Sequence, residues 1–166
     1  MPNTFGRFVN PNGHYYQGDV KFGRGNGEGV YVAGEIVFRG HFKDNVLHGE
    51  GEEKGNNYFF QGEYEYGSKK YGVLKYGPNV YEGGFEEDVF EGQGTLTTNE
   101  GKYTGAFHRG LQHGYGEFNW KNGSIYRGHY ERGAREGDGE FYNGETKSIC
   151  RGIWRRGVLE GEGIYQ

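Results

Sequence analysis

The segment YTGAFHRGLQHGYGEF, residues 103–118, decides the fold because its pattern recurs along the chain. Gly105 lies midway between Tyr103 and Phe107, and the Gly-x-Gly pair Gly114 and Gly116 begins nine residues after this anchor glycine. Equivalent anchor glycines follow one another at intervals of 21 to 24 residues: Gly18, Gly40, Gly62, Gly83, Gly105, Gly128 and Gly152. Seven copies in phase indicate a repeat array.

The pattern within each repeat has a period of two, which is typical of a β-strand. Tyr103, Gly105 and Phe107 therefore share one face of a strand, and the residues between them take the other face. The residues two before each anchor glycine form a first column, which is Tyr16, Phe38, Phe60, Tyr81, Tyr103, Tyr126 and Cys150. Those two after it form a second column, which is Val20, Phe42, Tyr64, Phe85, Phe107, Tyr130 and Trp154. A third column of mostly apolar residues follows the second glycine of each pair by two positions: Tyr31, Glu53, Leu74, Leu96, Phe118, Phe141 and Tyr165. Each repeat is thus predicted to contain two strands.

Turn chemistry supports a hairpin in every repeat. The residue five positions after each anchor glycine tolerates a left-handed backbone in all seven cases, the seven being Gly23, Asn45, Gly67, Asp88, Gly110, Gly133 and Gly157. Asn-Gly pairs, the strongest short hairpin signal, mark turns between repeats at Asn12-Gly13, Asn122-Gly123 and Asn143-Gly144.

The glycines that accompany the aromatic residues indicate what kind of sheet this is. A glycine leaves the pleat empty, so that a ring from a neighbouring strand can lie across it. The sequence therefore predicts an all-β protein: an elongated, twisted, single-layer antiparallel β-sheet of about seven consecutive hairpins, with an aromatic-lined groove. A single layer has no second layer to cover that face, so aromatic surface is expected to stay available to a partner.

The repeat strongly resembles the MORN repeat, the membrane occupation and recognition nexus motif. Residues 103–118 match its pattern closely, as do Tyr126–Tyr130 with Gly137–Phe141. The resemblance extends over nearly the whole chain, with three departures. Lys70 takes the place of the first glycine of a pair and leaves Gly72 alone, Glu53 replaces an apolar residue, and Cys150 replaces an aromatic one.

The repeats start near residues 16, 38, 60, 81, 103, 126 and 150, and residues 5–15 correspond to half a repeat. We expect one MORN repeat array over residues 1–166. Since arrays need protected ends, we expect either a piece of a longer protein, which we favour, or a subunit whose terminal edge strands are covered. A second copy covering such an edge would make a homodimer.

Composition agrees with a polar repeat protein, because 33% of the residues are hydrophobic and 17% are aromatic. Disordered segments have no reason to keep aromatic residues in columns, and no apolar run approaches the ~20 residues of a membrane-spanning helix. The first fifteen residues lack the apolar stretch of a secretory signal. A single cysteine excludes a disulfide framework within the chain and is consistent with a reducing cytosol.

Enzymatic chemistry is not indicated, and we expect no catalytic residue, cofactor or metal. Glycine-rich strings such as residues 23–27 are followed by no helical pattern, as a phosphate-binding loop requires. Cys150 lies in an aromatic column of a strand, where an apolar filler is the simpler interpretation. The six histidines follow the repeat phase and lie too far apart for one zinc ion. A zinc ion joining two chains through Cys150 and a histidine stays an open alternative.

Charge distinguishes among the possible partners. The net charge is −4, and residues 55–100 carry eight acidic and three basic side chains. A nucleic-acid partner would need a basic stripe, so we expect none. The best candidate for a weak contact with acidic lipid is the cluster of Arg151, Trp154, Arg155 and Arg156, which could equally be ordinary solvated arginines beside a sheet tryptophan.

A protein partner is the occupant that the aromatic columns favour. Rows of rings offer large apolar area at low cost in side-chain entropy. We therefore expect a non-catalytic scaffold or adaptor whose groove takes a helical or extended segment of another protein. The groove residues are predicted to be Tyr81, Phe85, Tyr103, Phe107, Tyr126 and Tyr130.

The family resemblance adds a cellular context and a second possibility. It implies a cytoplasmic location at the cytoskeleton or cell cortex, in a scaffolding assembly. The alternative function is a module that binds phosphoinositides or a membrane surface and tethers a complex there.

Overall fold

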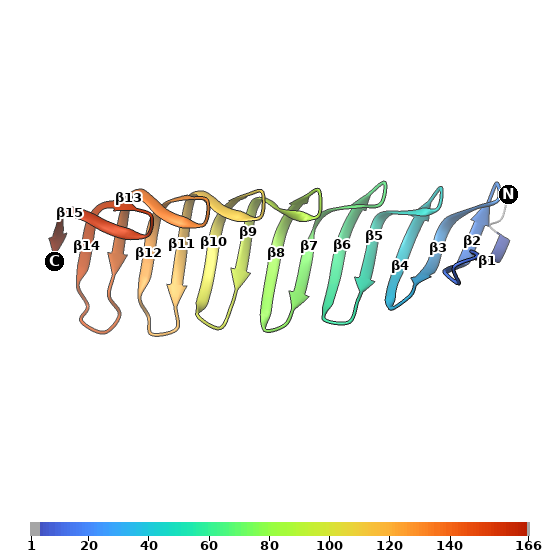
Figure 1. Cartoon of the computed structure of the whole chain (residues 1–166), viewed down its shortest axis with the longest axis horizontal. Helices are drawn as coiled ribbons and strands as arrows, with labels where there is room; N and C mark the ends of the chain where they lie inside the picture. The colour runs from blue at the N-terminus through green and yellow to red at the C-terminus, as the bar shows by residue number, and fades with distance from the viewer. Residues whose placement is uncertain (1–3, 166) are drawn as a thin grey trace. The chain divides into compact units, whose positions relative to one another are not determined.

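The computed structural model describes residues 4–165, with side chains described as far as Glu160. The described residues form one open antiparallel sheet of 15 strands, in which the order in space is the order in sequence (Figure 1). This confirms the prediction of an all-β, single-layer sheet built from consecutive hairpins. None of the described residues belongs to a helix long and apolar enough to cross a membrane.

The chain divides into two compact units. Unit 1 reaches to Gly77 and includes Glu86–Asp88. Its strands are β1 (Thr4–Val9), β2 (Tyr15–Lys21), β3 (Arg24–Ala33), β4 (Ile36–Lys43), β5 (Val46–Lys54), β6 (Tyr58–Glu65) and β7 (Ser68–Tyr76).

Unit 2 comprises Pro78–Phe85 and the chain from Val89 onward. It contains most of β8 (Asn79–Glu86), together with β9 (Val89–Thr97), β10 (Gly101–His108), β11 (Leu111–Trp120), β12 (Ile125–Glu131), β13 (Ala134–Tyr142), β14 (Ile149–Arg155) and β15 (Val158–Tyr165). Whether the whole chain is one array domain stays a prediction.

The strand register places the glycines of successive strands opposite one another. Gly105 of β10 pairs with Gly94 of β9 and with Gly116 of β11. The first and third aromatic columns meet in the next row, where Tyr103 pairs with Phe118. All three predicted columns therefore project from one face, the aromatic face, and the intervening residues project from the other, the polar face.

The hairpin turns have two consecutive left-handed residues, which is the geometry of a type I′ turn. The predicted turn residues all have positive φ angles, for example +85° at Gly110. The residue before each of them is left-handed as well, which was not predicted from the sequence. These preceding residues are Phe22, Asp44, Tyr66, Glu87, Arg109, Arg132 and Arg156.

The third repeat departs from the others at a bulge. In the fifth repeat, three residues of β11 lie opposite Ala106, and Gly114 among them has a φ of +85°. In the third repeat, Lys70 is the single extra residue, and it has no positive φ. The shorter bulge requires no left-handed residue, which explains how a lysine replaces glycine there.

Candidate functional site

Each tyrosine of the first column covers glycine backbone in its own hairpin. A Cβ atom at Gly116 would lie 2.5 Å from Cε2 of Tyr103, and one at Gly139 would lie 2.7 Å from Cε2 of Tyr126. Since only glycine leaves this space, the prediction that rings lie across the glycines is confirmed. The rings form the floor of the aromatic face.

A hydrogen bond that sequence reasoning missed holds these rings in place. Tyr103 Oη donates to the carbonyl oxygen of Ala106 at 2.8 Å, and Tyr126 Oη donates to that of His129 at 2.9 Å. Tyr16 and Tyr81 make the same bond three residues ahead, at 2.6 and 2.7 Å. The signal was present in the sequence, because tyrosine rather than phenylalanine occupies this column in four repeats.

The six residues predicted to line the groove come together in unit 2 and are buried there. Their exposed fractions are at most 8%. The rings meet edge to face both within repeats and between them, with centroids 5.0 Å apart for Tyr103 and Phe107 and 5.1 Å apart for Tyr103 and Tyr130. Such contacts stabilise the sheet by about 0.5–1.5 kcal/mol each beyond area burial. Contact of these six rings with a partner stays a prediction.

Half-buried ring surface lies along the third column and its continuation on β11. In unit 2 this surface comprises Phe118, Trp120 and Phe141, which we call the aromatic rim. The ring centroids of Phe118 and Trp120 are 4.6 Å apart, and those of Trp120 and Phe141 are 5.7 Å apart. Trp120 was missed because it lies outside the three columns, although it continues their alternation along β11.

One cation lies at the aromatic rim. The guanidinium carbon of Arg135 is 6.0 Å from the ring centroid of Trp120 and 5.6 Å from that of Tyr126. Arg135 Nη2 also donates to the carbonyl oxygen of Gly157 at 2.9 Å. The arginine is thus held against the rings and contributes its charge to the edge of the apolar surface.

In unit 1 one of the sequence departures, Glu53, belongs to a polar cluster with Lys69, whereas Lys70 pairs with Glu65 at 3.2 Å. Glu53 is buried and lies 3.2 Å from Lys69 Nζ. The hydroxyls of Tyr58 and Tyr64 donate to the same carboxylate, and Lys69 also pairs with Asp88 at 3.6 Å. Burial, followed by the charge of Glu53, raises the pKa of Tyr64 above its ordinary value.

An apolar hollow lies beside this cluster on the aromatic face of unit 1. It has a volume of about 160 Å³. Its walls are buried Phe42, Leu47 and Tyr64 together with the more exposed Val46. The remaining lining residues are Tyr31, Phe38, Asn45 and Gly67.

The structure does not bring together the four residues of the predicted lipid patch. Trp154 is buried on the aromatic face, with its ring 5.3 Å from that of Tyr126. Arg151 and Arg155 alternate to the polar face, where they pair with Glu140 at 2.6 Å and Glu160 at 3.3 Å. Arg156 is left-handed in the final hairpin turn. Headgroup binding by these arginines stays a prediction.

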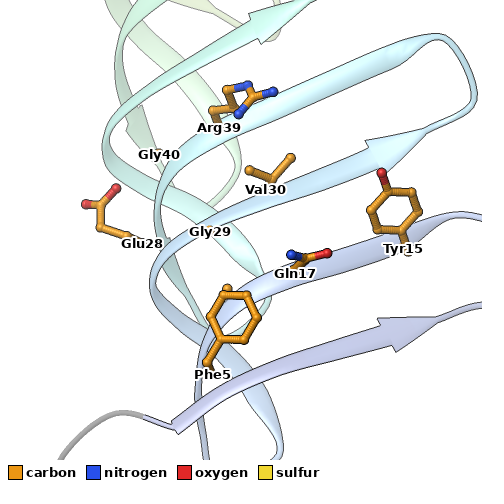
Figure 2. Close-up of a pocket in the computed structure, with 9 residues that line it drawn as sticks. Phe5, Tyr15, Gln17, Glu28, Gly29, Val30, Arg39 and Gly40 are labelled. Carbon is orange, nitrogen blue, oxygen red and sulfur yellow. The ribbon is translucent and has the colours of Figure 1, made fainter.

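The polar face carries charges that are paired across strands. In unit 2, Arg127 Nε lies 2.9 Å from Glu117, an exposed pair of a kind that contributes about 0–1 kcal/mol. In unit 1 a shallow pocket lies over the glycine row, where Phe5, Gln17, Val30 and Arg39 stand on four successive strands (Figure 2). Its mixed lining is that of an ordinary solvated sheet face.

Side chains that precede the glycine pairs join consecutive hairpin tips. His48 Nδ1 accepts from the backbone N–H of Tyr66 at 3.1 Å, and Glu91 accepts from that of Arg109 at 2.8 Å. Asn26 and Glu136 do the same for the next tips along the chain. This structural role accounts for the phase of His48. Within the part of the chain that the structure describes, no three His, Cys, Asp or Glu side chains are grouped to hold a metal ion.

Comparison with known proteins agrees with the repeat geometry. The model of the MORN repeat matches residues 16–33, 38–58, 81–102, 103–125 and 150–166, which together are more than half of the chain. The matches omit the third repeat, with its shortened bulge, and the sixth. No curated protein matches the chain. MORN repeats are non-catalytic and generally bind proteins or membranes, and this match shows that the chain belongs to the MORN repeat family.

Proposed function

We propose that this protein is a non-catalytic scaffold or adaptor that docks a helical or extended segment of a partner protein on its aromatic face. The observation that carries the proposal is the half-buried aromatic rim of Phe118, Trp120 and Phe141 above a floor of fully buried tyrosines. Large rings held rigidly by their neighbours are typical of interaction hot spots. The family context supports a cytoplasmic role in a cytoskeletal or cortical assembly.

The proposal places the contact on the aromatic rim more than on the six buried rings. A side chain with almost no exposed surface has little to offer a rigid partner. The buried rings instead support the rim: Phe118 pairs with Tyr103 on one side and with Tyr126 on the other. The six predicted groove residues therefore act on binding by holding the rim in position.

Affinity purification with matched variants tests this proposal. The intact chain, Trp120→Ala and Tyr115→Ala are each used as bait, and captured proteins are then purified and titrated against all three. Tyr115 is a suitable control because it is 60% exposed and lies on the polar face. Support requires a purified partner whose affinity falls with Trp120→Ala and is kept by Tyr115→Ala. Equal affinity for all three chains would refute the role of the rim.

Membrane-surface binding is a second candidate, favoured by the hairpin tips of unit 2. Arg109, Arg132 and Arg156 occupy equivalent turn positions and are exposed. Basic residues near an anionic surface contribute about 1 kcal/mol each. Sedimentation with phosphoinositide vesicles checks this candidate, which requires binding that weakens with salt and is lost when Arg155 and Arg156 are changed to alanine.

Homodimerisation through a terminal edge strand is compatible with both functions. An unpaired strand edge presents backbone N–H and C=O groups that a second copy can bond. Light scattering of the purified chain at several concentrations measures whether it forms such a dimer.

A further inference from the structure

The apolar hollow of unit 1 has the size of a side-chain pocket. Its volume of about 160 Å³ is close to the ~150 Å³ of an engineered apolar cavity that binds benzene. Phe42, Leu47 and Tyr64 form rigid walls because each is at most 4% exposed, while Val46 at the mouth is 38% exposed. The hollow can therefore take one bulky apolar side chain without rearrangement of its walls.

The position of Glu53 accounts for the opening of this hollow. Glu53 pairs with Phe38 across the strands, at a position where the fifth and sixth repeats place the rings of Phe118 and Phe141. Its carboxylate is held by Lys69 of β7 and by Tyr58 and Tyr64 of β6. The side chain thus turns toward those strands, and Phe38 packs against Tyr31 on its other side.

The edge of the hollow is acidic. Asn45 and Gly67, which line it, belong to the hairpin tips at residues 43–45 and 65–67, and the next tip is residues 86–88. These three tips carry five carboxylates and one lysine, and two of the carboxylates pair with lysines of β7, Glu65 with Lys70 at 3.2 Å and Asp88 with Lys69 at 3.6 Å. Asp44, Glu86 and Glu87 are exposed. The charge of Asp88 adds to burial and to Glu53 in raising the pKa of Tyr64, a wall of the hollow.

A ligand that binds in the hollow must be compatible with both its apolar walls and its acidic edge. Its anchor has to be apolar, since a polar group in the hollow would lose its water without gaining a partner. Its flanking residues pass beside the exposed Asp44, which adjoins the lining residue Asn45, and charges are incompletely screened over about 8 Å at physiological salt. Opposite charge on the ligand is therefore favoured.

We infer that the hollow is the anchor pocket for a basic segment of a partner protein, which inserts one leucine, methionine or phenylalanine between β4, β5 and the following hairpin tip. This inference rests on the proposed function and specifies the chemistry of the partner. It also adds a docking point in the second and third repeats, outside the region that the sequence singled out.

Selection of peptides from a random display library against the intact chain tests the inference. Selected peptides are synthesised and titrated against the chain, Val46→Lys and Leu111→Lys. Leu111 is the matched control because it holds the equivalent position after a hairpin turn in unit 2 and is 48% exposed. We expect basic peptides with a bulky apolar residue, an affinity loss on the order of tenfold with Val46→Lys, and no loss with Leu111→Lys.

A second pair of variants keeps the test independent of the hollow's packing. Glu86→Lys with Glu87→Lys reverses exposed charges at the acidic edge, and Glu131→Lys reverses one at a tip of unit 2. The double variant should weaken the peptides and the control should not. Selection of acidic or neutral peptides, or binding untouched by both Val46→Lys and the double variant, overturns the inference.

The Trp120→Ala variant separates this inference from the function it rests on. Peptides that no longer bind Trp120→Ala but still bind Val46→Lys would refute the anchor pocket while supporting protein docking on the rim. Peptides indifferent to both substitutions would count against docking on the aromatic face altogether.

Discussion

Glu53 and Lys69 form a nearly buried ion pair, with Oε1 and Nζ 3.2 Å apart and side chains only 12% and 13% exposed. Glu53 is an exception at its repeat position, where the other repeats have Tyr31, Leu74, Leu96, Phe118, Phe141 and Tyr165, whereas the position of Lys69 also takes polar residues in Gln112 and Arg135. The two charges compensate for each other beside Tyr64, which pairs with Lys69 in the register and donates a hydrogen bond to the Glu53 carboxylate.

The first prediction concerns this pair. Glu53→Leu or Lys69→Leu alone should lower the free energy of unfolding by about 2–4 kcal/mol, since each leaves a charge or a hydroxyl without its partner in a poorly hydrated site. The double variant should recover part of this loss, because two apolar residues remove the desolvation cost of the charges, while the Tyr64 hydroxyl still lacks its acceptor. Urea denaturation of all four chains measures the coupling energy, and additive single effects would contradict the prediction.

The second prediction concerns the tyrosine hydroxyls. Tyr103→Phe should destabilise the protein by about 1 kcal/mol, because the carbonyl oxygen of Ala106 loses its donor. Tyr126→Phe should do the same through His129. Tyr115→Phe, at a residue that is 60% exposed, is the control and should change stability by no more than about 0.5 kcal/mol. Thermal or urea unfolding distinguishes these values.

The third prediction separates the two members of a glycine pair. Gly116→Ala drives a Cβ atom into Tyr103 and should cost about 1–3 kcal/mol through overpacking. Gly114→Ala meets no close atom but must adopt a φ of +85°, which costs about 1–2 kcal/mol. Asparagine should therefore be tolerated better than alanine at residue 114 and no better at residue 116. If unfolding measurements ranked the alanine and asparagine variants in the same order at residues 114 and 116, the two glycines would not differ in the way predicted.

The fourth prediction is a loss of stability at alkaline pH. Burial raises the pKa of Tyr16, Tyr103 and Tyr126 to about 12. Tyrosine is charged only after it loses its proton, so the folded chain keeps protons that the unfolded chain releases near pH 10. Stability should be fully present below about pH 10 and fall between about pH 10 and about pH 12.

Ultraviolet absorbance of tyrosinate measures this effect directly. The folded chain should show a tyrosine fraction that titrates near pH 12, and the same chain in urea should titrate in one step near pH 10. Identical titrations in the two states would show that the rings are not buried in solution.

Periodicity predicted the strands and turns because it is a property of the backbone. Alternation defines the face that a residue occupies, and the seven turn residues that were predicted are all Gly, Asn or Asp. The left-handed conformation of the residue before each turn residue was not predicted, because residues such as Phe22 and Tyr66 rarely adopt a left-handed backbone. Bonds from the preceding repeat, such as that from His48 to Tyr66, help to hold it there.

The sequence predicted the arrangement of the candidate site less well than it predicted the strands and turns. Alternation gives the face of a ring but not the direction in which the ring leans. Tyr103 leans over Gly116 and becomes fully buried, while Phe118, opposite it on the same face, is only half-buried. The pairing of Glu53 with Lys69 depends on the register of the shortened bulge, which repeat counting showed only as an irregularity.

The hydrogen bonds between consecutive hairpin tips each connect residues only 18 to 20 positions apart in the chain, as in Asp44 to Asn26 and Arg156 to Glu136. Such bonds tie a repeat to its immediate neighbour and to nothing farther away. Duplication or loss of one complete repeat would break and remake a single junction while every other tip kept its partner. The gene for such an array can therefore change in length by whole repeats without each change having to be accommodated elsewhere in the protein.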